Sequence, residues 1–461
     1  MLFLRSATIM ALIFVFLSGC AGDNPPRDYR EGVENVILIV VDTLAAQNLG
    51  FMGYERNTSP VIDGFSQRSI VFERAYTPKA LTLPAFTSLF SGQHVMNHNV
   101  QGNGRALPEN LHLLTRDFSD SGFFTIGFAA SRVIDPRYGI DKGFEHYFPS
   151  GKYEIPAETV IEEVRNFLEN PASAGNPGFV GETRPLFMFI HFFDTHTDYK
   201  PDSEIALEFV NPDYKGPVDG RVKLFEKFNN YEIELNSDDL RHVRDLYDAE
   251  IRTFDTKLED LFYIFEQSGL MDNSLIVLTA DHGENLGEHH YITHGHPYEP
   301  GLHIPLMFRF PDDYGAGTEI DKLVELTDVV PTLMDIAGID IPSELDGQSL
   351  LPLIEDPSGD SGGFRDILIA CGGINNSGKR TFSLFDGKFR LIKDIRWSDT
   401  PLLYDISIDP KEENDISGEH SELVELYSAF IDLLYSGDST EDVFEYDFET
   451  LEMLRSLGYV Q

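Results

Sequence analysis

The chain has 461 residues and a formal net charge of −42, because 77 Asp and Glu residues stand against 35 Lys and Arg residues. A hydrophobic content of 42%, with 12% aromatic residues, excludes a disordered chain and suffices for one large domain plus a smaller one. The acidic residues are spread along the sequence, which predicts an acidic solvated surface and argues against nucleic-acid binding, since that requires a basic footprint.

The N-terminal segment predicts export. An apolar stretch over residues 7–17 is too short to span a membrane as a helix, and residues 17–20, Leu-Ser-Gly-Cys, resemble a bacterial lipobox. In such a motif Cys20 becomes the lipid-modified first residue of the mature chain; a plain cleaved secretory signal is the alternative. We therefore expect a lipoprotein signal peptide over residues 1–20 and a polar tether over 21–34. The protein would be exported and anchored by lipid to a bacterial cell-envelope membrane.

Three apolar runs, at residues 35–41, 186–193 and 275–280, show almost no alternation, as in strands buried on both faces of a parallel sheet. Acidic and imidazole side chains follow them: Asp42 after the first, Asp194 and His196 after the second, Asp281 and His282 after the third. Ligands of open α/β sheets collect outside the carboxyl ends of the strands, so these side chains are expected to meet in one site. Any one such Asp can instead cap a helix.

Helices and strands alternate through the rest of this region. Helices are expected over residues 58–65, 82–92, 111–120, 238–269 and 325–337, and strands over 70–76, 123–129 and 304–310. The helix at 82–92 has Thr82 placed to cap it, Pro84 in its first turn and Gly92 past its end. Residues 199–236 form a long polar insertion, expected on the substrate side.

A composition change marks the C-terminal part. Residues 356–363 are all Asp, Pro, Ser or Gly. Beyond them, β-like segments and then a helical stretch predict a small antiparallel sheet with a helix on it: 367–370, 381–385, 389–393, 402–405 and 421–435. The predicted fold is α/β, with a mainly parallel central sheet flanked by helices over residues 35–355 and a smaller antiparallel-sheet-plus-helix subdomain over 364–461.

Short motifs in a characteristic order run through nearly all of the chain after the tether. They lie at residues 36–44, 58–60, 82–84 with 91–92, 191–196, 247–252, 281–289, 331–332 with 337–338, 403–405 with 409–410, and 454–460. With these motifs the chain resembles the sulfatase branch of the alkaline phosphatase superfamily. The resemblance implies the alkaline-phosphatase-like fold and hydrolysis of a sulfate or phosphate ester.

The resemblance also implies one divalent cation held by Asp42, Asp281 and His282. Two carboxylates and an imidazole suit Ca²⁺, Mg²⁺ or Mn²⁺, and such an ion polarises a sulfate or phosphate oxygen. His196 and His294 match positions where the family places groups that contact the transferred group or protonate the leaving oxygen. They are the expected catalytic histidines, and a third one, His296, is expected to assist in binding substrate.

The chain departs from sulfatases at the nucleophile. Sulfatases attack through a formylglycine made from the first residue of a Cys/Ser-x-Pro-x-Arg motif, whereas the matching run here begins with Thr82 and ends with Phe86. Oxidation of a threonine would leave a ketone, so the aldehyde cannot form. The Lys and His that sulfatases carry after the next strand are also missing, at residues 129–132. Other branches of the superfamily use a plain Thr, and a helix N-terminus beside a metal favours its alkoxide. We therefore expect Thr82 to be the nucleophile; a helix cap is the alternative.

Three functions remain open. The first is an exported metal-dependent ester hydrolase acting on a small ester, a glycan or a lipid headgroup. The second is a phosphoryl or headgroup transferase that uses Thr82 in the same first step, and the third is a catalytically lapsed surface binding protein of the same fold. Retention of the metal-ligating and catalytic residues favours an enzyme. The substitutions predict faster turnover of an aryl phosphate or phosphodiester than of an aryl sulfate, whereas the oligomeric state is left open.

Overall fold

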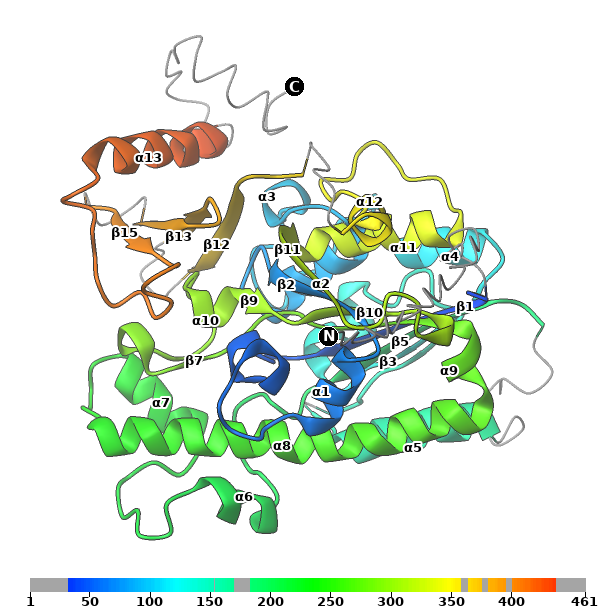
Figure 1. The fold of residues 1–461 in the computed structure, drawn as a ribbon, viewed down its shortest axis with the longest axis horizontal. Helices are drawn as coiled ribbons and strands as arrows, with labels where there is room; N and C mark the ends of the chain where they lie inside the picture. Colours follow the sequence, from blue (N-terminus) through cyan, green and yellow to red (C-terminus); the bar gives the residue numbers. More distant parts are fainter. Residues whose placement is uncertain are drawn as a thin grey trace, which may run out of the picture.

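The computed structural model describes residues 32–152, 154–169, 183–357, 364–374, 380–394 and 400–436. These residues form a large α/β unit and a smaller antiparallel sheet with a helix packed on it, which confirms the predicted fold class (Figure 1). The expected signal peptide, Cys20 and the motif at 454–460 lie outside the described residues. Within the described ranges, no helix combines the length and the apolar character needed to cross a bilayer.

The central sheet has nine strands in the order β11-β2-β10-β6-β1-β5-β3-β4, with β9 pairing to β2. At its middle, β1 (Asn35–Val41) runs parallel to both β5 (Leu186–Phe192) and β6 (Ser274–Ala280). Every residue of these three strands is buried, as expected for apolar runs without alternation. Because the three strands are parallel, they end at the same edge of the sheet.

Six further strands complete the sheet: β2 (Ile70–Tyr76), β3 (Phe124–Phe128), β4 (His146–Phe148), β9 (His303–Ile304), β10 (Leu306–Arg309) and β11 (Thr318–Glu325). β3 and β4 continue it in parallel beyond β5. Pro305 separates β9 from β10, so the strand expected over residues 304–310 is two short strands. β10 is antiparallel to β6 and β2, whereas β11 is parallel to β2. β11 was not predicted, because its first residues are partly exposed and polar.

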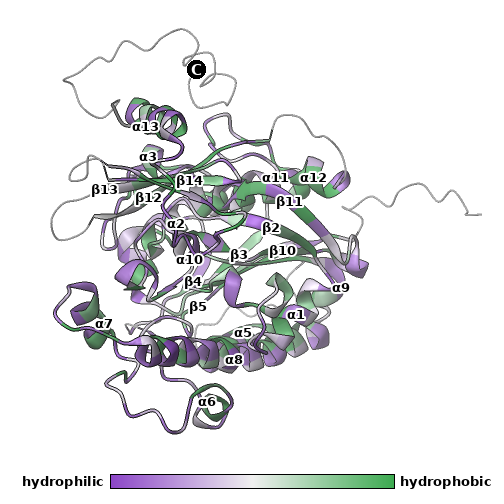
Figure 2. Cartoon of the chain, turned by 60° about the vertical axis from the view of Figure 1, so that its left-hand side comes forward, coloured by the Kyte–Doolittle hydropathy of each residue, from purple (hydrophilic) through white to green (hydrophobic). Residues whose placement is uncertain are grey.

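Helices cover both faces of this sheet (Figure 1). On one face lie α2 (Thr82–Ser91), α4 (Leu114–Asp120) and α11 (Val329–Ala337), and on the other lie α1 (Pro60–Ser66), α5 (Ala157–Glu169) and the long α8 (Ser237–Ser268). Figure 2 shows the hydrophobic strands enclosed between these layers. The shorter helices are α3 (Val95–His98), α6 (Ser203–Phe209), α7 (Val222–Asn229), α9 (Leu270–Asn273), α10 (Glu299–Leu302) and α12 (Leu351–Glu355). All ten residues of α2 are buried, so its first turn is held firmly.

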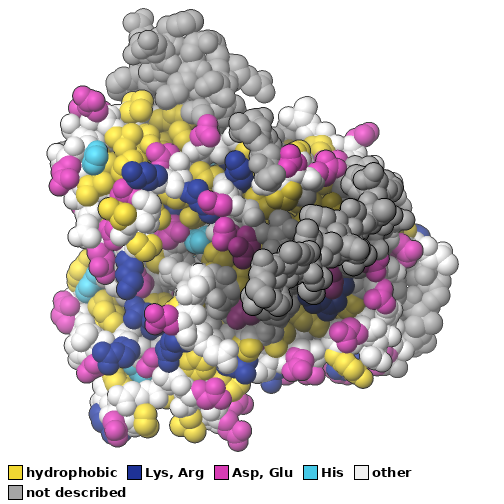
Figure 3. Space-filling model, viewed as in Figure 1, with side chains coloured by type: hydrophobic (Ala, Val, Ile, Leu, Met, Phe, Trp, Pro, Cys, Tyr) yellow, Lys and Arg dark blue, Asp and Glu magenta, His cyan; other side chains and the backbone are white. Residues whose placement is uncertain are grey.

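The polar insertion over residues 199–236 contains α6 and α7. α6 packs against α8, and α7 packs against β8 (Ile292–Thr293), which pairs with β7 (Asn285–Leu286). The insertion therefore lies against the loop that contains β7 and β8 and is followed by His294 and His296. Acidic side chains are scattered over the face seen in Figure 3, with Lys and Arg among them, as the even spread of charge along the sequence predicts.

The C-terminal sheet is antiparallel throughout. It consists of β12 (Leu368–Ile374), β13 (Arg380–Phe385), β14 (Phe389–Asp394) and β15 (Leu402–Asp405), in that order. Helix α13 (Ser421–Ser436) packs on it through a separate apolar cluster that includes Phe382, Leu391 and Phe430. Backbone and side-chain bonds join this sheet to the segment before α2: Cys371 N–H donates to Pro78 O (2.9 Å), and Lys79 Nζ donates to Gly372 O (2.8 Å).

Candidate metal and catalytic site

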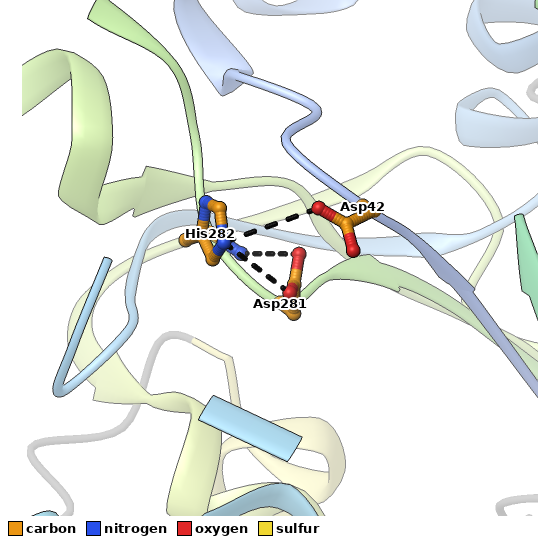
Figure 4. A group of neighbouring side chains, drawn as sticks. All are labelled: Asp42, Asp281 and His282. Atoms are coloured by element: carbon orange, nitrogen blue, oxygen red, sulfur yellow. Dashed lines mark hydrogen bonds and ion pairs between the residues drawn. The ribbon is translucent and has the colours of Figure 1, made fainter. Parts of the chain in front are cut away.

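Three buried side chains converge at the carboxyl edge of the central sheet (Figure 4). Asp42 directly follows β1, and Asp281 and His282 directly follow the neighbouring β6; each is 0% exposed. Nε2 of His282 lies 3.4 Å from Oδ2 of Asp281 and 3.9 Å from Oδ1 of Asp42. One ligand atom from each residue lies within 4.8 Å of the other two, so a single ion can contact all three.

The bonding of these side chains leaves open the atoms that a cation needs. Oδ1 of Asp281 accepts the backbone N–H groups of Thr43 (3.2 Å) and His282 (2.8 Å), while Oδ2 of Asp281 and both carboxylate oxygens of Asp42 are buried without a hydrogen-bond partner. Nδ1 of His282 donates to the carbonyl of Gly283 (2.9 Å), so Nε2 is the free ligand. Orphaned buried oxygens are rare in folded proteins, and a bound cation would satisfy these three. The set of two carboxylates and one imidazole fits a divalent cation.

The pKa values of the three side chains also support a metal site. Burial raises the pKa of Asp42 to about 8 and raises that of Asp281 well above its usual range, where the charge of Asp42 adds to the effect. Burial also lowers the pKa of His282 well below its usual range. Two carboxylates in a dry pocket repel one another unless a positive charge lies between them. The pocket thus favours a neutral imidazole and calls for a cation, which is the charge pattern of a metal site.

Thr82 faces this cluster. It is the first residue of α2, and the preceding Leu81, with φ −158° and ψ 128°, is the residue at the cap position. The alternative that Thr82 serves as the helix cap is therefore wrong. Its hydroxyl lies 3.5 Å from Nε2 of His282, and the residue is 1% exposed. Since Nδ1 of His282 carries the ring hydrogen, Nε2 has a lone pair, and the Thr82 hydroxyl therefore lies beside the atom that would bind the cation.

The expected catalytic histidines His196 and His294 lie beside the cluster. The ring of His294 is 4.5 Å from that of His282 and 5.0 Å from that of His196. Nδ1 of His196 donates to Thr197 O (2.6 Å), and its ring stacks on Phe193 at 4.2 Å. In both histidines Nδ1 is engaged and Nε2 is left available.

His296 is placed differently. Its ring contacts are with Tyr291 (4.0 Å) and Tyr298 (6.4 Å), and burial lowers its pKa to about 4. The structure therefore groups His296, two residues after His294, with the aromatic residues Tyr291 and Tyr298 of the loop.

Glu284 belongs to the site and was missed in the sequence. It is 0% exposed; its Oε2 accepts Nδ1–H of His294 (2.9 Å), and its Oε1 accepts the hydroxyl of Tyr199 (3.0 Å). Burial lowers the pKa of His294, but the charge and the hydrogen bond of Glu284 raise it by more, so the pKa lies above its usual value. The β7–β8 register pairs Asn285 with Thr293, and this pairing brings Glu284 opposite His294.

Asp194 does not join the site. Its Oδ1 accepts the backbone N–H of Ala157 (2.9 Å) at the start of α5, and burial raises its pKa to about 7. The expectation that all three strand-end aspartates meet is wrong here. In the β1–β5 register Val41 pairs with Phe192, so Asp194 lies one position beyond the equivalent of Asp42. Successive side chains alternate between faces, which turns Asp194 toward α5.

Comparisons with known proteins identify the family of this chain. The Sulfatase family model matches residues 34–339, and the model for the C-terminal part of N-sulphoglucosamine sulphohydrolase matches residues 287–432. An N-acetylglucosamine-6-O-sulfatase of Bacteroides thetaiotaomicron is 21% identical over 90% of this chain and 87% of its own length.

Two solved structures show the same fold. One is a protein solved in complex with its substrate, D-glucosamine-2-N,6-O-disulfate; the TM-score is 0.72 at 19% identity, and the match covers 92% of this chain and 98% of that one. The other is the phosphonate monoester hydrolase of Agrobacterium radiobacter (TM-score 0.70, 21% identity, 87% of this chain and 95% of that one). The Sulfatase model alone spans well over half of the chain. This protein therefore belongs to the sulfatase family and is a sulfatase-like ester hydrolase.

Proposed function

We propose that this protein is an exported, metal-dependent hydrolase of sulfate or phosphate esters that uses Thr82 as its nucleophile. The observation that carries the proposal is the contact between the Thr82 hydroxyl and Nε2 of His282 (3.5 Å), a nitrogen that also faces both carboxylates of the metal-ligating cluster. A hydroxyl held in the first turn of a fully buried helix, beside a cation site, is placed for nucleophilic attack.

Each residue has a distinct role in this mechanism. Asp42, Asp281 and His282 hold the divalent cation (Ca²⁺, Mg²⁺ or Mn²⁺), which when bound polarises an ester oxygen and favours the ionised Thr82 hydroxyl. The N-terminus of α2 adds a favourable field for the anionic group under attack.

The Thr82 hydroxyl first releases its proton to solvent water; Oγ1 then forms a bond to phosphorus or sulfur, and the bond to the leaving oxygen breaks. His294, held through Nδ1 by Glu284, gives the Nε2 proton to that oxygen. His196 presents its free Nε2 to the transferred group. Water then attacks the Thr82 ester and gives one proton back to His294, while Oγ1 of Thr82 leaves as the alkoxide with which the cycle began.

Two features favour phosphodiesters among the candidate esters. The nucleophile is a hydroxyl, not the aldehyde hydrate of sulfatases. Moreover, the charged side chains that most affect Asp42 are His294 and Glu284, and those that most affect Asp281 are Asp42 and His294, so among the described residues no Lys or Arg ranks with them. With few positive charges to balance a substrate, a monoanionic diester is bound at lower cost than a dianionic monoester.

Export and substrate class complete the proposal. The lipobox-like residues 17–20 support a lipid anchor at Cys20 and a location in the cell envelope. The sulfated glucosamine named for similar proteins supports a glycan ester as one substrate candidate, alongside a lipid headgroup or another small ester.

The test is a comparison of substrates and of two threonine variants. With Mn²⁺, Mg²⁺ or Ca²⁺ present, a bis-aryl phosphodiester and an aryl phosphate are expected to be turned over faster than an aryl sulfate. Thr82→Ala is expected to abolish turnover. Thr87→Ala is the matched control, because Thr87 lies in the same helix, fully buried, with its hydroxyl bonded to the Leu83 carbonyl (2.6 Å). Equal activity of Thr82→Ala and wild type would refute the role of Thr82, and a preference for the aryl sulfate would refute the phosphoryl preference.

A further inference from the structure

The two oxygens of Asp42 face different partners. Oδ1 lies 3.9 Å from Nε2 of His282, on the side of the metal-ligating cluster. Oδ2 lies 3.4 Å from Nε2 of His191. Both oxygens and Nε2 of His191 are buried, and none of the three has a hydrogen-bond partner with good geometry among the described residues. One oxygen is therefore available to a cation, while the other is available to His191.

The bonding of His191 determines which of its nitrogens carries hydrogen. Nδ1 accepts the backbone N–H of Ala130 (3.3 Å), so in the neutral ring the hydrogen is on Nε2, the nitrogen that lies 3.4 Å from Oδ2 of Asp42. His191 is 0% exposed, and it lies on β5, where it pairs with Val40 of β1. Both rigid strands thus set the distance between the imidazole and the carboxylate.

Aromatic rings set the plane of this imidazole. Phe86 packs edge-on against His191, with ring centroids 5.0 Å apart and an interplanar angle of 85°. Phe189 and Phe193 lie at 6.4 and 6.2 Å. Phe86 occupies the position where the sulfatase motif has an arginine, so an apolar ring replaces a charged donor at this point. His191 Nε2 lies 3.4 Å from Oδ2 of Asp42, so His191 can donate a hydrogen bond to this oxygen.

We propose that His191 is a positioning residue for the metal site: its Nε2–H holds Oδ2 of Asp42, so that Oδ1 is presented to the cation, and Phe86 holds the His191 ring in the required plane. Hydrogen bonds to a ligating carboxylate orient it, and loss of such a partner commonly weakens metal affinity by about 10- to 100-fold. The proposal rests on the metal site of the proposed function, but not on the chemistry of Thr82.

Two substitutions of His191 distinguish its role as a hydrogen-bond donor to Asp42 from its role in filling the core. Asn keeps a group near the position of Nδ1, able to accept from Ala130, but is too short to reach Asp42. Gln places an amide N–H near the position of Nε2 and keeps the donor. Mn²⁺ affinity, measured by titration calorimetry on the purified full chain, is expected to fall about 10- to 100-fold in His191→Asn and by less than about tenfold in His191→Gln.

His98 provides the matched control. It is also buried, its Nδ1 accepts the backbone N–H of Val100 (3.0 Å), and its Nε2 bonds Ser88 (2.9 Å). His98→Asn is expected to lower the melting temperature and to leave Mn²⁺ affinity unchanged. The proposal is overturned if His191→Asn binds Mn²⁺ like wild type, if Asn and Gln weaken binding equally, or if the wild-type chain does not bind Mn²⁺. Because the readout is metal affinity, a chain that binds Mn²⁺ as expected but is inactive would count against Thr82 chemistry and not against His191.

Discussion

Replacing Arg390 by Met is expected to destabilise the junction between the two sheets. Arg390 of β14 is 1% exposed and forms ion pairs with Glu299 of α10 and with Glu412, whose Oε1 lies 3.1 Å from the arginine Nε. Its guanidinium also lies over the rings of Tyr76 and Phe385, at 5.4 and 4.5 Å. Removing the guanidinium takes away the arginine charge that pairs with two buried carboxylates, and breaking a buried ion pair in this way commonly costs about 3–5 kcal/mol.

The lowered pKa of Glu299 gives a second estimate of the stability that the ion pair with Arg390 contributes. Burial alone would raise this pKa, but the charge of Arg390, with His303, lowers it from 4.5 to about 2. A decrease of this size corresponds to roughly 3 kcal/mol of stability from the ionised carboxylate. Because the folded pKa lies below the unfolded one, this stability is present above about pH 4.5 and is lost as pH falls toward 2.

Urea unfolding followed by circular dichroism provides the assay. Near neutral pH, Arg390→Met is expected to lose about 3 kcal/mol of unfolding free energy. Its stability is also expected to fall less steeply with acid than that of wild type, because Glu299 no longer has a lowered pKa. Arg137→Met is the control, since Arg137 pairs with Asp135 at an exposed position and no measurable change is expected there. An Arg390→Met chain that unfolds at the wild-type urea concentration would refute the reasoning.

Three further predictions concern the site and its surroundings. Glu284→Gln removes the charge that holds Nδ1–H of His294 and is expected to lower kcat by about 10- to 100-fold while leaving KM within a few-fold; an unchanged kcat would contradict the role of Glu284. Removal of metal with EDTA is expected to abolish turnover and lower the melting temperature, and Mn²⁺ at about 100 times its Kd should restore about 2.7 kcal/mol, measured by calorimetry. Burial lowers the pKa of His98 to about 3, so the unfolded chain takes up the proton first as pH falls below 6.5. The stability lost by about pH 5 is therefore expected to be roughly 2 kcal/mol smaller in His98→Asn than in wild type, and equal losses would be inconsistent with a neutral buried His98.

The strands that carry the site could be predicted because continuous apolar runs of this length, rich in β-branched residues, are typical of strands buried on both faces. β2 covers the expected residues 70–76, and β1 and β6 deliver Asp42, Asp281 and His282 at one edge of the sheet. Local patterns sufficed for these residues, since each side chain directly follows a recognisable strand.

Contacts that depend on register or on distant partners could not be predicted. The face to which Asp194 points follows from the pairing of β1 with β5, and the meeting of Glu284 with His294 follows from the β7–β8 register. His191 was hidden as a single polar residue within an apolar strand, and only the tertiary structure places it against Asp42. In the same way, Thr82 has the sequence features of a helix cap, whereas the backbone assigns that position to Leu81.

The most direct test of the central claim is a mass spectrum of the peptide that carries Thr82, taken after brief mixing of the metal-loaded protein with an aryl phosphate and an acid quench. Nucleophilic attack by Thr82 leaves a phosphoryl group on this peptide, and Thr82→Ala should not acquire it. Turnover of the substrate with an unmodified Thr82 peptide, or with the phosphoryl group on another residue, would contradict the account.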